Sequence, residues 1–210
     1  MVEKIATTQW LIGIDEAGRG PLAGPVAVGV VAMRYSDYNK LDLQKKGIRD
    51  SKKLSEKQRH EWNEWMLSEV RAKRMFSTVS LVSHTTIDAY GIVPAIKAGI
   101  ENGLKRVTSH VDIVSPSCQV LLDGGLRAPE EFTNQTTIIR GDEKEPIIAL
   151  ASIIAKVTRD THMIALAKEY PEYGFDVHKG YGTVAHYQTI HTHGLTPIHR
   201  KTFLKKIKAG

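Results

Sequence analysis

The residues of this sequence best suited to chemistry are two adjacent acids beside a glycine-flanked arginine. Asp15 and Glu16 are followed, after one alanine, by Gly18-Arg19-Gly20. Two hard oxygen ligands suit a divalent cation, and an arginine next to them suits a phosphate group. Taken alone, such a pair is more often a polar surface at the end of a strand.

Two further acids follow strand-like segments. Asp123 comes directly after residues 117–122, and Asp142 follows residues 136–140. Each also has an ordinary interpretation, Asp123 as part of an Asp-Gly turn and Asp142 as a helix cap. If these strands share a sheet, however, their ends can meet. Four crowded carboxylates could not all stay ionised without cations, because like charges raise each other's pKa.

Ligation by oxygen alone selects Mg²⁺ or Mn²⁺. Two such ions, about 3.5 to 4 Å apart, can clamp the attacking and leaving oxygens of a phosphoryl displacement. The acids therefore predict metal-dependent chemistry on a phosphate ester, carried by Asp15, Glu16, Asp123 and Asp142.

Apolar and β-branched runs predict the strands that would position these acids. The runs are residues 10–14, 24–33, 75–82, 117–122 and 136–140, and the first two are close enough in sequence to pair antiparallel. Asp15 and Glu16 then lie at or near the exit of the first strand. Neighbouring side chains of a strand point to opposite faces, so both acids reach one site only if the backbone turns there. Gly18 and Gly20 permit such a turn.

Helical spacing predicts helices over residues 55–74, 86–107, 147–170 and 183–192, and a last basic helix on which Phe203, Leu204 and Ile207 face inward. Ser55 and Gln58 form a capping box at the start of the first helix. Pro94 marks a break or a first turn within the second, and Pro146 suits the first turn of the third. Residues 34–53 are polar and predict a loop.

The composition is typical of a soluble globular protein. Of the 210 residues, 41% are hydrophobic and 25% are charged, which predicts one domain with a small appendage. No apolar run approaches the roughly 18 residues of a membrane-spanning helix, and the N-terminus lacks a signal-peptide pattern. The single cysteine, Cys118, fits a reducing compartment. We therefore expect a cytoplasmic protein that does not associate with a membrane.

The positive charge of the chain lies at its C-terminal end. Residues 177–210 contain six Lys or Arg and no acid, whereas residues 1–176 contain 23 basic and 23 acidic residues. This excess favours a polyanionic partner, although a solubilising tail would look the same. The loop 173–183 mixes glycine, aromatic and basic residues, which suits a nucleic-acid backbone with stacked bases.

Five histidines fall in the C-terminal region, at positions 178, 186, 191, 193 and 199. No paired cysteines and no zinc-ligand spacing accompany them. We therefore expect scattered polar histidines and no zinc site.

Several segments, taken in order, resemble the motifs of the bacterial ribonuclease HII family. They are residues 13–26 (Gly-Ile-Asp-Glu-Ala-Gly-Arg-Gly-Pro-Leu-Ala-Gly-Pro-Val), 50–54 (Asp-Ser-Lys-Lys-Leu), 123–124, 141–142, 151–160, 178–183 and 197–200. The blocks cover nearly the whole chain, and their combination is specific although no single block is. The resemblance implies an RNase H-like α/β fold, with a five-stranded mixed sheet flanked by helices and a small helical C-terminal extension. Residues 1–170 would form the catalytic domain, and residues 171–210 a basic, helical, substrate-binding part packed on it.

The resemblance also implies an activity. The protein would hydrolyse the RNA strand of RNA–DNA hybrids and nick 5′ of single ribonucleotides embedded in duplex DNA, leaving 3′-hydroxyl and 5′-phosphate ends. The four acids would bind two Mn²⁺ or Mg²⁺ ions. The substrate would be bound by Gly18, Arg19 and Gly20, which read the ribose 2′-hydroxyl, by Lys52, and by Tyr181, which stacks at the RNA-to-DNA junction. We expect a monomer without a protein partner, since residues 201–210 contain no clear sliding-clamp docking motif.

Two other functions stay open on the sequence. One is a ribonuclease of the same fold that needs several consecutive ribonucleotides. The other is a binding module without catalysis, which the four acids disfavour, because a pure binder would not need negative charge facing phosphate.

Overall fold

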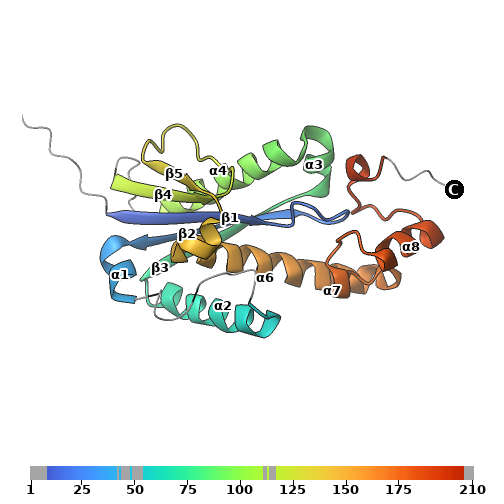
Figure 1. The fold of residues 1–210 in the computed structure, drawn as a ribbon, viewed down its shortest axis with the longest axis horizontal. Helices are drawn as coiled ribbons and strands as arrows, with labels where there is room; N and C mark the ends of the chain where they lie inside the picture. Colours follow the sequence, from blue (N-terminus) through green and yellow to red (C-terminus); the bar gives the residue numbers. More distant parts are fainter. Residues whose placement is uncertain are drawn as a thin grey trace, which may run out of the picture.

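The structure, a computed structural model of the chain, describes residues 9–41, 43, 48, 54–110, 113 and 117–205. Within these ranges a five-stranded sheet has helices on both faces (Figure 1). The strands are β1 (Trp10–Ala17), β2 (Val26–Arg34), β3 (Met75–Val82), β4 (Cys118–Asp123) and β5 (Gln135–Ile138). The helices are α1 (Tyr35–Leu41), α2 (Glu56–Arg71), α3 (His84–Tyr90), α4 (Ile92–His110), α5 (Gly141–Lys144), α6 (Pro146–Glu169), α7 (Phe175–His178) and α8 (Val184–His193), with 3-10 turns η2 (Pro171–Tyr173) and η3 (Lys201–Phe203).

The sheet is mixed, as the resemblance implies, with the strand order β3-β2-β1-β4-β5. β1 pairs antiparallel with β2, and β2 pairs antiparallel with β3. β4 is parallel to both β1 and β5. Parallel strands need a crossover connection, and β3, α3 and α4 lie in the one between β1 and β4. The C-terminal ends of β1 and β4 consequently meet at the same edge of the sheet.

Alternate residues of β1 face two different helical layers. Ile12 and Ile14 belong to an apolar cluster that also contains the buried residues of α4. Leu11 belongs to a second cluster, built mainly with α6. Because side chains alternate along a strand, the position of a residue in β1 decides which helix it meets.

α6 lies unusually close to the sheet because two strand positions are glycine. A Cβ at Gly13 of β1 would collide with the main-chain oxygen of Ile147, and one at Gly29 of β2 with that of Ala151. Glycine in a strand interior often marks such a close approach of another backbone. The polar groups of α6 can therefore reach the residues of β1 directly.

Several predicted boundaries are confirmed. β3 spans the predicted residues, and α2 begins after the capping box in which Ser55 and Gln58 exchange side-chain and backbone hydrogen bonds. Pro146 occupies the first turn of α6. The predicted helix 86–107 is divided into α3 and α4 at Gly91, whose φ is +89°, and Pro94 lies in the first turn of α4.

Two predictions are wrong. The sequence predicts a loop over residues 34–53, whereas residues 35–41 form α1. Tyr35 and Tyr38 of this helix pack against the α6 side of the core, so tertiary packing overrides the polar composition. At the other end, where a basic helix is predicted, the described residues up to 205 form the 3-10 turn η3; Phe203 is 36% exposed, whereas Leu204 is buried. Ile207 lies outside the described residues.

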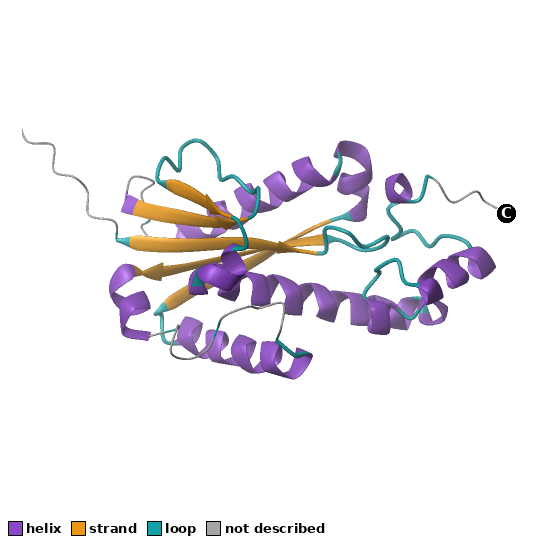
Figure 2. Ribbon diagram, in the orientation of Figure 1, coloured by secondary structure: helices purple, strands orange, loops and turns teal. Residues whose placement is uncertain are grey.

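Beyond the C-terminal end of β1, the chain forms a smaller layer with its own apolar cluster. Tyr173, Phe175 and Ile190 make this cluster with Leu22 and with Met163 of α6. α7 and α8 lie in this layer, and loops gather between it and the sheet (Figures 1 and 2). No helix within the described ranges is long and apolar enough to cross a bilayer.

Candidate active site

Asp15 and Asp123 lie next to each other at the ends of two parallel strands. The last paired positions of β1 and β4 are Ile14 and Leu122, so the two acids are the next residues on neighbouring strands. Along each strand, every second residue faces α6, and both acids fall on such positions. The sheet therefore brings these two carboxylates together on its α6 face.

The charge of Glu16 acts at the same place, although β1 continues through both acids without the predicted turn. Burial raises the pKa of Asp15 well above its ordinary value, and the charges of Glu16 and Asp123 raise it further. A hydrogen bond from Ser152 of α6 acts in the opposite direction. Burial also raises the pKa of Glu16, partly offset by Arg19. Three of the four predicted acids thus share one electrostatic environment.

This donor set has the chemistry that a divalent cation requires. Asp15 is only 3% exposed, and buried like charges are costly unless a cation compensates them. In the described ranges, however, no three His, Cys, Asp or Glu side chains are grouped as a ready metal site. One oxygen of Asp15 accepts from the N–H of Glu16 at 2.7 Å, and one oxygen of Asp123 accepts from the N–H of Gly141 at 2.5 Å. Each of these carboxylates keeps further lone pairs, so the bonds orient the acids without excluding a cation.

Asp142 is connected to Asp123 through the backbone of the residue before it. It follows Gly141, whose N–H bonds Asp123, and both belong to α5. Its side chain is fully buried. The alternative role of Asp142 as the cap of the next helix is wrong, because Glu145 occupies the N-cap position of α6.

The turn after β1 depends on Gly18. Its φ is +88°, a conformation that favours glycine, and a Cβ there would collide with the side chain of Arg159. Gly20 differs, because nothing lies within 4 Å of the position that its Cβ would take. Between them, the exposed Arg19 places Nη1 3.2 Å from Oε1 of Glu16. The turn is thus packed on one side and open on the other.

A pocket of about 360 Å³ joins this turn to the C-terminal layer. Tyr181 is 41% exposed, and Lys156 Nζ and Arg159 Cζ each lie 5.7 Å from the centre of its ring. The predicted residues Glu16, Gly18–Gly20 and Tyr181 therefore share one cavity, whose lining is Glu16, Ala17, Gly18, Arg19, Gly20, Arg59, Ser152, Ile153, Lys156 and Tyr181.

A larger groove, of about 940 Å³, lies between α4 and residues 125–135 and shares only Arg19 with this pocket. Its lining mixes basic side chains with Glu101, Glu130 and Glu131. Glu16 and the ring of Tyr181 line the smaller pocket and are not part of this groove, so we assign the site to the smaller pocket.

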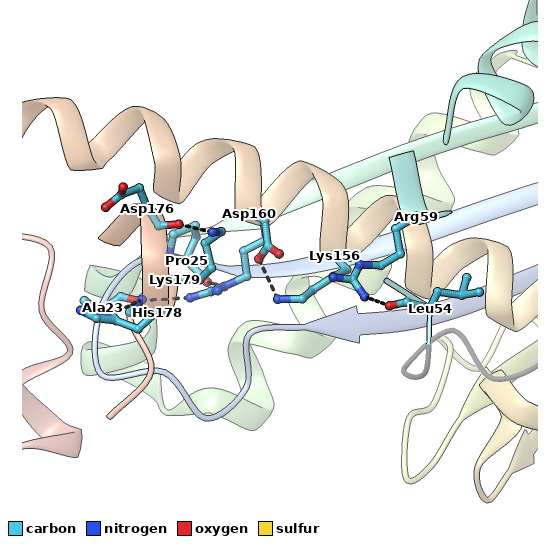
Figure 3. A network of polar contacts seen from close by, with 11 residues as sticks. Ala23, Pro25, Leu54, Arg59, Lys156, Asp160, Asp176, His178 and Lys179 are labelled. Atoms are coloured by element: carbon cyan, nitrogen blue, oxygen red, sulfur yellow. Dashed lines mark hydrogen bonds and ion pairs between the residues drawn. The ribbon is translucent and has the colours of Figure 1, made fainter. Parts of the chain in front are cut away.

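Three polar residues of the pocket have no role assigned from sequence: Arg59, Ser152 and Lys156. Ser152 and Lys156 are four residues apart on α6, so they share a helix face, and polar residues in the otherwise apolar first half of this helix were a usable signal. Arg59 comes from α2 and carried no such signal. Figure 3 shows Arg59, bonded to the carbonyl of Leu54, near Lys156, which pairs with Asp160. Lys52 lies outside the described residues.

Three of the five C-terminal histidines are not scattered, which corrects that part of the prediction. The rings of His178 and His186 stack with their centres 4.4 Å apart, and Nε2 of His186 is 3.0 Å from Nε2 of His199. His199 Nδ1 accepts from the N–H of Thr196, so its proton is on Nε2 and is donated to His186. His186 Nδ1 then donates to the carbonyl of Tyr181 at 2.9 Å. A chain of neutral histidines thus ends on the backbone of a pocket residue.

The sequence profile of a family described as "Ribonuclease HII" matches residues 12–206, which include the pocket and all four acids. The chain belongs to the ribonuclease HII family. The ribonuclease HII of Clostridioides difficile is 41% identical over 195 residues, which are 93% of this chain and 70% of that protein.

Solved structures agree with this assignment. Ribonuclease HII from Archaeoglobus fulgidus, determined as a complex with PCNA, is 27% identical with a TM-score of 0.67, over 90% of this chain and 93% of that one. Bst-RNase HIII, determined in complex with Mn²⁺, has a TM-score of 0.63 over 94% of this chain and 65% of that one. At 14% identity the second likeness shows the fold alone. The RNase H-like fold is therefore confirmed.

Membership of the ribonuclease HII family gives the class of the enzyme. It is a ribonuclease H, a metal-dependent endonuclease that hydrolyses the RNA strand of RNA–DNA hybrids. Enzymes of this class use divalent metal ions.

Asp15→Asn removes one of three neighbouring negative charges. At pH 7 without divalent ions we expect a higher thermal unfolding midpoint, by about 2–4 °C for each kcal/mol of relieved repulsion. Mn²⁺ or Mg²⁺ should raise the midpoint of the unaltered protein and change that of the variant much less. Asp176→Asn, which alters an exposed acid, is the control and should behave like the unaltered protein. An unchanged metal response in Asp15→Asn would contradict the shared site.

The histidine chain should make stability depend on pH. Burial, with the nearby His186, His178 and His84, lowers the pKa of His199 to about 4, whereas an unfolded histidine titrates near 6.5. The folded state therefore binds this proton less readily, so stability is full above about pH 6.5 and falls as the pH drops toward 4. Urea unfolding at several pH values should show a shallower fall for His199→Asn. Equal slopes for the two proteins would exclude His199 as the source.

Proposed function

We propose that this enzyme also nicks duplex DNA on the 5′ side of a single embedded ribonucleotide, leaving 3′-hydroxyl and 5′-phosphate ends. One observation carries the proposal: Glu16, the open glycine turn and Tyr181 line the same pocket. A catalytic acid, a turn able to contact a sugar hydroxyl and an aromatic ring are thus within one small cavity. The 2′-hydroxyl is the group that distinguishes a ribonucleotide from the surrounding DNA, so recognition must be local.

The residues proposed to hold two Mg²⁺ or Mn²⁺ ions are Asp15, Glu16, Asp123 and Asp142. Support comes from the raised pKa of Asp15, which the charges of Glu16 and Asp123 help to cause. Such ions, when bound, supply a nucleophile and stabilise the charge of the leaving oxygen. The protein supplies the placement, because β1 and β4 fix the first three acids relative to each other. Asp142 joins them through the bond between Gly141 and Asp123.

The proposed ribonucleotide reader consists of Gly18, Arg19 and Gly20. The open space beside Gly20 lets a sugar approach the backbone without meeting a Cβ. Tyr181 is proposed to stack at the junction between RNA and DNA, and the cation of Lys156 close to its ring supports a position near phosphates. Lys52 is proposed as a further substrate contact.

We further propose a division of labour between residues 1–170, which carry the catalytic acids, and residues 171–210, which bind the substrate. The separate apolar cluster of the C-terminal layer supports this division. So does the charge of residues 177–210, which contain six basic residues and no acid. Contacts of the exposed cations among them with phosphates would position the duplex without reading its sequence.

The direct test uses labelled duplexes with one ribonucleotide, with four consecutive ribonucleotides, or with none, each with and without Mg²⁺ or Mn²⁺. We expect metal-dependent cleavage of the first two, with one cut 5′ of the single ribonucleotide. Asp15→Asn should bind the same duplexes and cut none of them. An enzyme that cuts only the four-ribonucleotide duplex would refute the single-ribonucleotide activity and leave the hybrid activity intact.

Tyr181→Ala should lower kcat/KM on the single-ribonucleotide duplex by about tenfold or more, the order expected for a lost base stack. The loss on a long hybrid should be smaller, because that substrate has no junction at most cleavage sites. Tyr181→Phe keeps the ring and should retain most activity. Tyr187→Ala, which removes an exposed ring outside the pocket, is the control. Equal losses on both substrates would argue against a junction role.

A further inference from the structure

Arg200 is a fully buried arginine whose side chain binds the loop after β1. Nη2 donates to the carbonyl of Gly18 at 2.8 Å, and Nη1 donates to that of Arg19 at 3.0 Å. Nε bonds the carbonyl of Gly24 at 2.9 Å, and Nη2 also bonds that of Pro25 at 3.0 Å. These acceptors are all main-chain oxygens of residues 18–25, far from Arg200 in sequence.

The planar guanidinium is suited to this task. Its donors have a fixed fork geometry, so several carbonyl groups are held in one arrangement, which the single ammonium of a lysine cannot do. Burial lowers the pKa of Arg200 to about 9, and the positive charge of Arg159 contributes. Removing a cation from water is costly, and the four carbonyl oxygens that accept from the guanidinium offset that cost.

The bonds to Gly18 and Arg19 also orient their peptide groups. In a trans peptide the C=O and the following N–H point in opposite directions. Since the carbonyls of Gly18 and Arg19 face Arg200, the N–H groups of Arg19 and Gly20 face away from it. Residues 18–20 line the pocket, so these two donors are presented on the side that is open to a substrate.

Neighbouring contacts keep Arg200 itself in place. The carboxylate of Asp88 accepts from the N–H groups of Lys201 and Thr202, each at 2.9 Å, and from the hydroxyl of Thr202 at 2.6 Å. The N–H of Arg200 bonds the carbonyl of Leu22 at 2.7 Å. These bonds hold the backbone at Arg200 and at the two residues after it, and so fix the position from which the guanidinium reaches the loop.

We propose that Arg200 is a positioning residue for ribonucleotide recognition, which holds the Gly18–Gly20 turn so that two amide N–H donors face the pocket. The inference rests on the proposed role of this turn as the reader. Arg200 does not touch the substrate; it acts through the main-chain carbonyls that it binds. Its loss should therefore affect the distinction between ribose and deoxyribose, and leave general binding of phosphates unchanged.

The test measures two affinities in the inactive Asp15→Asn background, by fluorescence anisotropy in Mg²⁺ buffer. One duplex contains a single ribonucleotide, and the other has the same sequence entirely in DNA. Adding Arg200→Lys should reduce the preference for the ribonucleotide by about fivefold or more, the order of one misplaced hydrogen bond. The affinity for the DNA duplex should change by less than about twofold on the same scale.

The ratio of two affinities of one protein does not depend on the fraction that is folded, so a merely structural role would not change it. Lys201→Ala removes the adjacent exposed charge and should leave the preference intact. Asp88→Ala, which releases the segment carrying Arg200, should lower the preference in the same direction. A preference retained in both Arg200→Lys and Asp88→Ala overturns the inference alone. No preference with Arg200 intact overturns the proposed reader, and the inference with it.

Discussion

The placement of neighbouring acids at the ends of β1 and β4 is the constraint on which the rest of the structure depends. Asp15 and Asp123 are fixed by the register of two parallel strands, and burial, followed by the charges of Glu16 and Asp123, raises the pKa of Asp15. Such a pair is unfavourable in a fold unless cations compensate it. The close approach of α6, made possible by Gly13 and Gly29, completes the site because it brings Ser152 to Asp15. The sheet thus positions the carboxylates of Asp15 and Asp123, and α6 adds a hydrogen bond to one of them.

A second constraint comes from the far end of the chain. Residues 18–25 leave the sheet and are held by two buried guanidinium groups, since Arg159 bonds the carbonyls of Ala23 and Pro25 while Arg200 bonds those of Gly18 and Arg19. An irregular loop buried this deeply needs partners for its carbonyl groups, and the two arginines provide them. The pocket takes one of its lining residues, Tyr181, from the C-terminal layer. The basic part of the chain and the end of β1 that carries Glu16 thus contribute to one cavity.

Short sequence patterns correctly predicted those features that depend on neighbouring residues in the chain. The capping box at Ser55, the limits of β3 and the position of Asp123 at the end of its strand all follow from short-range patterns. α1 was missed because its tyrosines pack against a core cluster built from residues distant in the sequence. The histidine chain and the contacts of Arg200 were missed for a similar reason. Each joins residues whose proximity depends on the whole fold, so neither spacing nor composition could indicate it.

The two halves of the site differ in how firmly they are formed. The glycine turn is fixed by a positive φ at Gly18, by Arg159 packed against it and by the fork of Arg200. The acids are less complete, because no ready metal group exists in the described ranges. A fixed turn loses little entropy on binding, whereas carboxylates can rearrange when cations arrive. The proposed reader is thus held by the fold itself, whereas the proposed metal site would be completed by the ions that it binds.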